Sequence, residues 1–538
     1  MTRFMVFLLC LMSFFKLQAQ NEIKFLQAVQ KGNLNEVKSL IEKGININCA
    51  DQNGNTGLII AVREGHYEIA RTLISNECDV NQKNAMEYSP LLYAVEIEDI
   101  EMVKLLVEHG ANVNDATHTG TTALMLAVES GNFEMVKYLL EHKANPNGWE
   151  RVKGETALMW AIIWGYEDIA RLLIDRGAQV NANQIRGFTP LMFACDSGRF
   201  EMVKYLLQKG ADPNLEDRKG ENCLSHLSEN GNIEIAKYLT GYQYDNEKKL
   251  SIEGYNGFLA IKMAASQGDL DFLKYLISNR KTKPFDLTVA LLIASGREKM
   301  NIVMYLVENQ QVDVNSVNET GLTALMAAAQ AGKMEAVKYL IAHNADPNKR
   351  QKDGKTALIM AVRGGYSQIV EFLINNGANM NIADDVSETN VYGTPLMHAA
   401  ELGHTEIARL LVMAGADIDF KNQFGYDALL VALNFDRFDL AELLIKHGAN
   451  VNTKNKKGFT ALMIAASKGN LALVRMLVEN GAMLNQINKE KAMSALDLAI
   501  AGKDISEKLK DKVAIESYRQ VIEFLQSKGA KKASELMK

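Results

Sequence analysis

The feature that most constrains the fold is a short motif that returns about every 33 residues along the chain. Thr-Ala-Leu-Met occurs four times and Thr-Pro-Leu-Met twice, with degenerate copies between them. The leucine of each copy falls at positions 58, 91, 124, 158, 191, 224, 325, 358, 396, 429, 462 and 496. A fixed period of this length indicates a stack of similar small units rather than several unrelated globular domains.

Each unit has the pattern of two short helices joined by turns. Thr122 precedes one apolar-patterned stretch and can accept from the free N–H groups that begin a helix. The spacing predicts helices over 123–130 and 133–142, separated by Gly131, which can adopt a left-handed backbone at a helix end. Such short helices cannot bury their apolar faces alone, whereas stacked neighbours bury a continuous strip. We therefore expect a helix-rich repeat solenoid of about fifteen units.

The spacing also predicts how the chain is organised. About three periods separate Leu224 from Leu325, so two degenerate repeats are expected there, with Ile261 and Leu291 at the motif position. The stack either continues there as one curve or bends. A charged insertion at Asp504–Ser517 is expected to lengthen a helix of the last repeat. The predicted segments are a leader at 1–19, repeats at 20–240, degenerate repeats at 241–311, repeats at 312–490 and a capping repeat at 491–538.

The first nineteen residues have the layout of a cleavable secretory signal. Arg3 gives a positive start, Phe4–Phe15 is a short apolar run, and Ala19 precedes a polar stretch. The alternative is a buried first helix. The signal predicts an exported protein, periplasmic or secreted after cleavage near Ala19, and no later stretch has the length of an apolar membrane span.

The charge and cysteine content of the chain limit the classes of function that it can have. The net charge of -6 argues against a general nucleic-acid binder, which usually needs a basic face. Cys195 and Cys223 lie in adjacent repeats at positions usual for small apolar residues, so buried thiols are expected, with a disulfide as the alternative.

The repeated motifs resemble those of the ankyrin-repeat family. The matching stretches are Gly187–Leu191, Gly65–Ala70, Gly403–Ala408, Gly110–Asn114 and Gly448–Asn452. The resemblance implies a right-handed superhelical stack of β-hairpins and helix pairs that binds other proteins. It does not imply catalysis. One departure is methionine where the family usually has histidine after Thr-Pro-Leu. We expect these methionines to fill the core rather than to sense oxidation.

Residues with no framework role in such a stack are candidate contacts for a protein partner. They are apolar or charged residues at the hairpin tips and at the ends of the first helices. One candidate patch comprises Trp149, Arg151, Trp164, Tyr166, Ile185 and Arg186. We expect the third tryptophan, Trp160, to lie in the core. A second candidate region is the lengthened loop Ile382–Val391, which carries Asp384, Asp385 and Glu388, together with Phe420 and Phe424. A projecting acidic loop there is expected to bind a basic partner. The alternative is a loop that is only solvated.

The sequence lacks the common motifs of catalytic and cofactor-binding sites. No phosphate loop, dinucleotide fingerprint or zinc spacing occurs, so no cofactor and no metal are expected. His109, His142, His343 and His447 recur at the ends of second helices, where a structural role is expected. The sequence favours a monomeric, non-enzymatic scaffold in a bacterial envelope that binds a protein partner. The alternatives are a secreted effector or toxin-immunity protein and, less favoured, an enzyme or metal-dependent sensor.

Overall fold

The computed structural model describes residues 18–227, 232–242, 250–279, 282–385, 393–490 and 492–537, and all that follows refers to these residues. The chain divides into two compact units, Met1–Ala260 and Ile261–Lys538, with the boundary inside helix α14. The helices of the first unit, after a helix over 18–30, are α2 (Leu34–Glu42), α3 (Gly57–Arg63), α4 (Tyr67–Ser75), α5 (Pro90–Glu96), α6 (Ile100–Glu108), α7 (Ala123–Glu129), α8 (Phe133–Glu141), α9 (Ala157–Trp164), α10 (Glu167–Asp175), α11 (Pro190–Asp196), α12 (Phe200–Gln208), α13 (Ile233–Thr240) and the start of α14 (Gly254–Gln267).

The second unit continues the same alternation of short helices. Its helices are α15 (Leu270–Ser278), α16 (Pro284–Gly296), α17 (Met300–Met304) with the π-helix η1 (Tyr305–Asn309), α18 (Ala324–Gln330), α19 (Met334–Ala342), α20 (Ala357–Arg363), α21 (Ser367–Asn375), α22 (Pro395–Leu402), α23 (Thr405–Met413), α24 (Ala428–Asn434), α25 (Phe438–Lys446), α26 (Ala461–Ser467), α27 (Leu471–Glu479), α28 (Ala495–Leu509), α29 (Lys512–Ser527) and α30 (Ala533–Leu536).

The threonine of the repeated motif begins the first helix of most repeats. Thr122 has an extended backbone, and its hydroxyl accepts the N–H of Met125 at 3.2 Å. Gly131 follows the helix with a φ of 68°. A side-chain cap of this kind contributes roughly 1 kcal/mol to helix stability. The same bond, to the N–H three residues on, recurs at Thr56, Thr156, Thr189, Thr323, Thr356 and Thr460.

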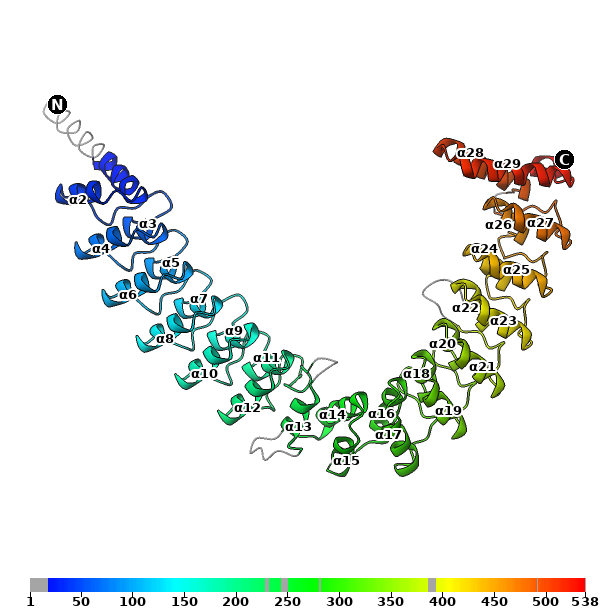
Figure 1. Cartoon of the computed structure of the whole chain (residues 1–538), viewed down its shortest axis with the longest axis horizontal. Coiled ribbons are helices and arrows are strands. Elements are labelled where there is room, and N and C mark those ends of the chain that lie inside the picture. Colours follow the sequence, from blue (N-terminus) through cyan, green and yellow to red (C-terminus); the bar gives the residue numbers. More distant parts are fainter. Residues whose placement is uncertain are drawn as a thin grey trace, which may run out of the picture. The chain divides into compact units, whose positions relative to one another are not determined.

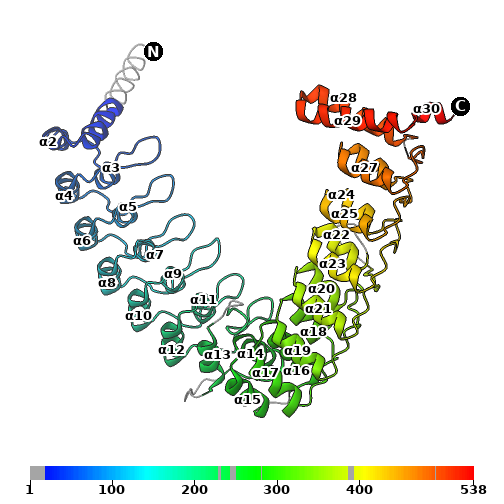
Figure 2. The same ribbon diagram turned by 45° about the vertical axis from the view of Figure 1, so that its right-hand side comes forward.

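Within the first unit the helices form two adjacent rows, as predicted for a repeat solenoid. Helices α3, α5, α7, α9 and α11 make one row and α4, α6, α8, α10 and α12 the other (Figure 1). The loops that join consecutive pairs project beyond the first row (Figure 2). The motif methionines lie between neighbouring helices and are at most 1% exposed, which confirms that they fill the core; they are Met125, Met159, Met192, Met326, Met397 and Met463.

Asparagine side chains join one repeat to the next. The Oδ1 atom of Asn114 accepts the N–H of Asn145 at 2.6 Å, and its amide donates to the carbonyl of Lys143 at 3.3 Å. Asn452 makes the same pair of bonds with Met483 and Gly481. These bonds satisfy backbone groups in the turns, which explains why asparagine ends the Gly-Ala-Asn-Val-Asn motif.

Three details refine or correct the sequence expectations. The predicted hairpins are short, and among the described residues they carry isolated β-bridges such as Trp149–Thr156. A turn at 223–226 replaces the first helix of the repeat that contains Leu224. The charged insertion Asp504–Ser517 lengthens both α28 and α29 instead of one helix, since Lys510 takes a left-handed backbone and ends α28 within it.

The four described cysteines are buried free thiols, as expected for Cys195 and Cys223. Burial raises the pKa of Cys49 and of Cys78 to about 12, so these thiols stay protonated at neutral pH. No helix in the described part of the chain is both long and apolar enough to cross a membrane.

Candidate protein-binding site

Three positions recur beneath the hairpins of the stack, and we call the residues at these positions the hairpin set. The first residue donates its backbone N–H to the carbonyl of the second, and the third lies five positions after the second, in the first helix or in the turn that replaces it. In one repeat the set is Glu150, Glu155 and Trp160, and the indole N–H of Trp160 donates to Glu155 Oε2 at 2.9 Å. The sequence analysis missed this convergence, although the constant five-residue spacing could have revealed it.

Trp149 and Ile185 line one depression of about 520 Å³ beside this hairpin set. Trp149 is 57% exposed and Ile185 43%. The backbone N–H of Ile185 donates to the carbonyl of Lys153 at 2.8 Å, which holds one hairpin against the next. Val152, not predicted, is 69% exposed at the same hairpin tip. The bonded hairpins therefore hold large apolar side chains exposed at one surface.

Trp164 lies apart from Trp149, so the predicted patch is divided. It ends α9, whereas Trp149 pairs with Thr156 immediately before α9 begins, and an eight-residue helix is about 12 Å long. Trp164 is half exposed beside Ile163, which is also exposed. Trp160 was predicted to lie in the core. It is half-buried, and its indole N–H is bonded to Glu155.

The remaining residues of the first candidate patch contact neighbouring repeats. The ring of Tyr166 lies against Gly131, where a Cβ atom would come within 2.7 Å of it, so Tyr166 serves the stacking of repeats. The guanidinium of Arg151 donates to the carbonyl of His118 at 3.2 Å. Arg186 is exposed, and its carbonyl accepts the N–H of Arg218 at 3.0 Å.

The structure contradicts the prediction that Asp384 contacts a partner, because its carboxylate is buried. Asp384 accepts the N–H of Gly393 at 2.8 Å and contacts His398 Nε2 at 2.9 Å. Asp385 is exposed but forms an ion pair with Arg350 at 2.7 Å. Phe420 is half-buried and Phe424 is 42% exposed. The rest of the predicted acidic loop, including Glu388, lies outside the described residues.

His398 is the centre of a buried charged group that sequence analysis did not detect. Its Nδ1 lies 3.0 Å from Arg363 Nη1 and 3.5 Å from Glu401 Oε2, opposite the Nε2 contact with Asp384. Burial lowers the pKa of His398, but hydrogen bonds to Asp384 and Glu401 outweigh it, and the net shift is upward. Neutral His398 can accept from Arg363, whereas the protonated ring can donate to both carboxylates.

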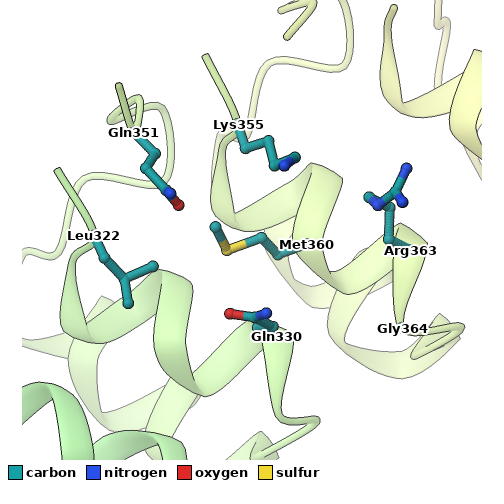
Figure 3. A pocket seen from close by; sticks show the side chains of 7 residues that line it. All are labelled: Leu322, Gln330, Gln351, Lys355, Met360, Arg363 and Gly364. Carbon is teal, nitrogen blue, oxygen red and sulfur yellow. The ribbon is translucent and has the colours of Figure 1, made fainter. Parts of the chain in front are cut away.

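A cavity of about 360 Å³ lies between α18 and α20 (Figure 3). Gln351, Lys355 and Met360, one hairpin set, line it together with Leu322, Gln330, Arg363 and Gly364. Both cations already have acidic neighbours, since Lys355 pairs with Asp353 at 2.7 Å and Arg363 lies 3.5 Å from Glu401. The cavity is therefore a polar recess with compensated charge rather than an anion site.

The recurring histidines serve the helix ends, as expected. The Nδ1 of His109 lies 2.8 Å from the carbonyl of Leu105, four residues earlier. His142, His343 and His447 make the same contact. Each satisfies a carbonyl that the end of the helix leaves without an intrahelical donor.

Comparison with known proteins agrees with the repeat architecture. A family model described as ankyrin repeats in three copies matches residues 8–84, 25–117, 74–149, 91–184, 149–217, 191–290, 291–384 and 384–455, and one described as ankyrin repeats in many copies matches 444–499. Among curated proteins, Alpha-latroinsectotoxin-Lt1a of Latrodectus tredecimguttatus is 35% identical over 92 residues. That stretch is 17% of this chain and 6% of the toxin.

Proposed function

Because this chain belongs to the ankyrin-repeat family, whose repeats serve protein–protein interaction, we propose that it is a non-enzymatic scaffold that grips a protein partner through its hairpin tips. The observation that carries the proposal is the depression lined by Trp149 and Ile185. Exposed tryptophan is the residue type most often dominant at protein interfaces, since it buries a large area at small entropic cost. The overall acidity of the chain favours a partner with a basic contact face.

Replacing Trp149 by alanine is expected to weaken partner binding by roughly thirtyfold or more, the effect of losing about 2 kcal/mol at a central aromatic contact. The partner is first isolated by crosslinking to the wild-type chain and identified by mass spectrometry, and its affinity is then measured by titration calorimetry. Met86→Ala is the matched control, because Met86 is 61% exposed on another hairpin of the same unit. Equal affinities for wild type and Trp149→Ala would exclude this depression as the docking site.

We also propose that the protein is exported to the periplasm or beyond it, on the strength of the residue pattern at 1–19. Intact-mass measurement on protein purified from a periplasmic fraction is expected to give a chain that begins near Gln20. Recovery of the chain from the cytosol with Met1–Ala19 still attached would refute export.

A further inference from the structure

We propose that Asp217, Glu221 and His226 form a binding site for a divalent transition-metal ion, with Zn²⁺ as the best match. These residues are the hairpin set of the repeat whose first helix is replaced by a turn at 223–226. One ligand atom from each lies within 4.8 Å of the other two, and no other group of this kind occurs in the part of the chain that the structure describes. One imidazole and two carboxylates are ligands that Zn²⁺ accepts, with a fourth position left for water or a partner group.

The distance between two of the ligand atoms suits a metal better than a hydrogen bond. His226 Nε2 lies 3.4 Å from Asp217 Oδ2, beyond the usual range for N–H···O. Bonds of about 2.0–2.1 Å to one tetrahedral zinc would separate two ligand atoms by about 3.3 Å. His226 Nε2 is also buried without a hydrogen-bond partner, an arrangement that is rare unless something else satisfies the nitrogen.

The surrounding contacts fix the ligands in advance. Asp217 Oδ1 accepts the N–H groups of Lys219 at 2.8 Å and Glu221 at 3.0 Å, which leaves Oδ2 directed at His226. Burial raises the pKa of Asp217, but these backbone bonds outweigh it and hold the pKa below its ordinary value. The His226 ring packs on Phe188 with centroids 4.3 Å apart. Such supporting contacts are what orient metal ligands in proteins.

Equivalent residues in other repeats show what a closed hairpin set looks like. Asp384 and His398 occupy the same first and third positions in the second unit and contact each other directly at 2.9 Å. Trp160 donates to Glu155 at the same distance. Asp217 and His226 have the same placement and stay 3.4 Å apart, with the carboxylate of Glu221 beside them.

The test is to titrate the full chain with ZnCl₂ under reducing conditions and to measure the stoichiometry and affinity of binding by calorimetry. Wild type is expected to bind one Zn²⁺ at this site, and His226→Phe to lose that site or bind at least about tenfold more weakly. Phenylalanine is chosen because Phe193 holds this position in the preceding repeat, so the variant is expected to fold. His118→Ala, which removes an exposed histidine of the same unit, is expected to bind as wild type does.

Circular dichroism and thermal melting separate loss of the ligand from loss of the fold. Zn²⁺ is expected to raise the melting temperature of wild type and His118→Ala but not of a folded His226→Phe chain. Should His226→Phe unfold, Asp217→Asn supplies the second variant, because an amide keeps the shape of the side chain. Unchanged stoichiometry and affinity in the folded variant would overturn the site, and so would a wild-type chain that binds no Zn²⁺. Co²⁺ provides a further check, since a thiolate-to-cobalt charge-transfer band would assign binding to Cys195 and Cys223 instead.

Discussion

Substituting alanine for His398 is expected to lower the local stability of the second unit by about 3–5 kcal/mol, the cost of breaking a buried charged group by removing one member. His398 is fully buried, and its removal leaves Asp384 and Arg363 without their shared partner. Hydrogen-exchange mass spectrometry measures the effect as faster exchange of the amides in α22. His343→Ala is the control, since that side chain lies outside α22 and contacts the carbonyl and the ring of Tyr339. Equal exchange in α22 for both variants would contradict the prediction.

The same substitution should alter the pH dependence of this region. The pKa of His398 is raised in the folded chain above its unfolded value of about 6.5. Its contribution to stability is therefore fully present below about pH 6.5 and is lost as the pH rises through the folded pKa. The difference in α22 exchange between wild type and His398→Ala is expected to shrink between pH 6 and pH 9, after correction for the intrinsic exchange rate. A difference that grows with pH would show that the folded pKa is shifted downward.

Replacing Met125 by alanine is expected to destabilise the first unit by about 2–5 kcal/mol, because a fully buried side chain leaves a cavity between stacked helices. Met125→Leu should cost less than about 1.5 kcal/mol, since leucine fills nearly the same volume. Exchange rates in α7 and α5 measure both effects. Met413→Ala, at a side chain that is 74% exposed, provides the surface control. A Met125→Leu variant as unstable as Met125→Ala would show that the sulfur contributes more than its volume.

Much of the local structure follows from the residues themselves. The motif threonine caps the first helix in most copies, although Thr394 makes no such bond, and the motif methionines are core residues, as their spacing predicts. Both are local properties, because a cap acts over three residues and a buried face repeats every three or four. Trp149 and Phe424 are exposed, and their contact with a partner stays a prediction.

The errors arose where residues from different segments meet. Asp384 has the sequence context of an exposed acidic loop, but its carboxylate is buried and contacts His398. The ring of Tyr166 fills the space left by Gly131 in the preceding repeat, and its contact with a partner stays a prediction. Neither partner is identifiable from the spacing of one repeat alone.

The repeat period, the caps and the apolar faces are thus determined by the sequence, because each depends on residues within one turn or one helix pair. Tertiary structure alone decided how closely the polar side chains beneath the hairpins approach one another. The turn from the hairpin into the first helix brings residues of one repeat close together. Asp384 and His398 contact each other at 2.9 Å, whereas Asp217 and His226 stay 3.4 Å apart. The spacing along the sequence does not set this difference, because both pairs hold the same positions of the hairpin set.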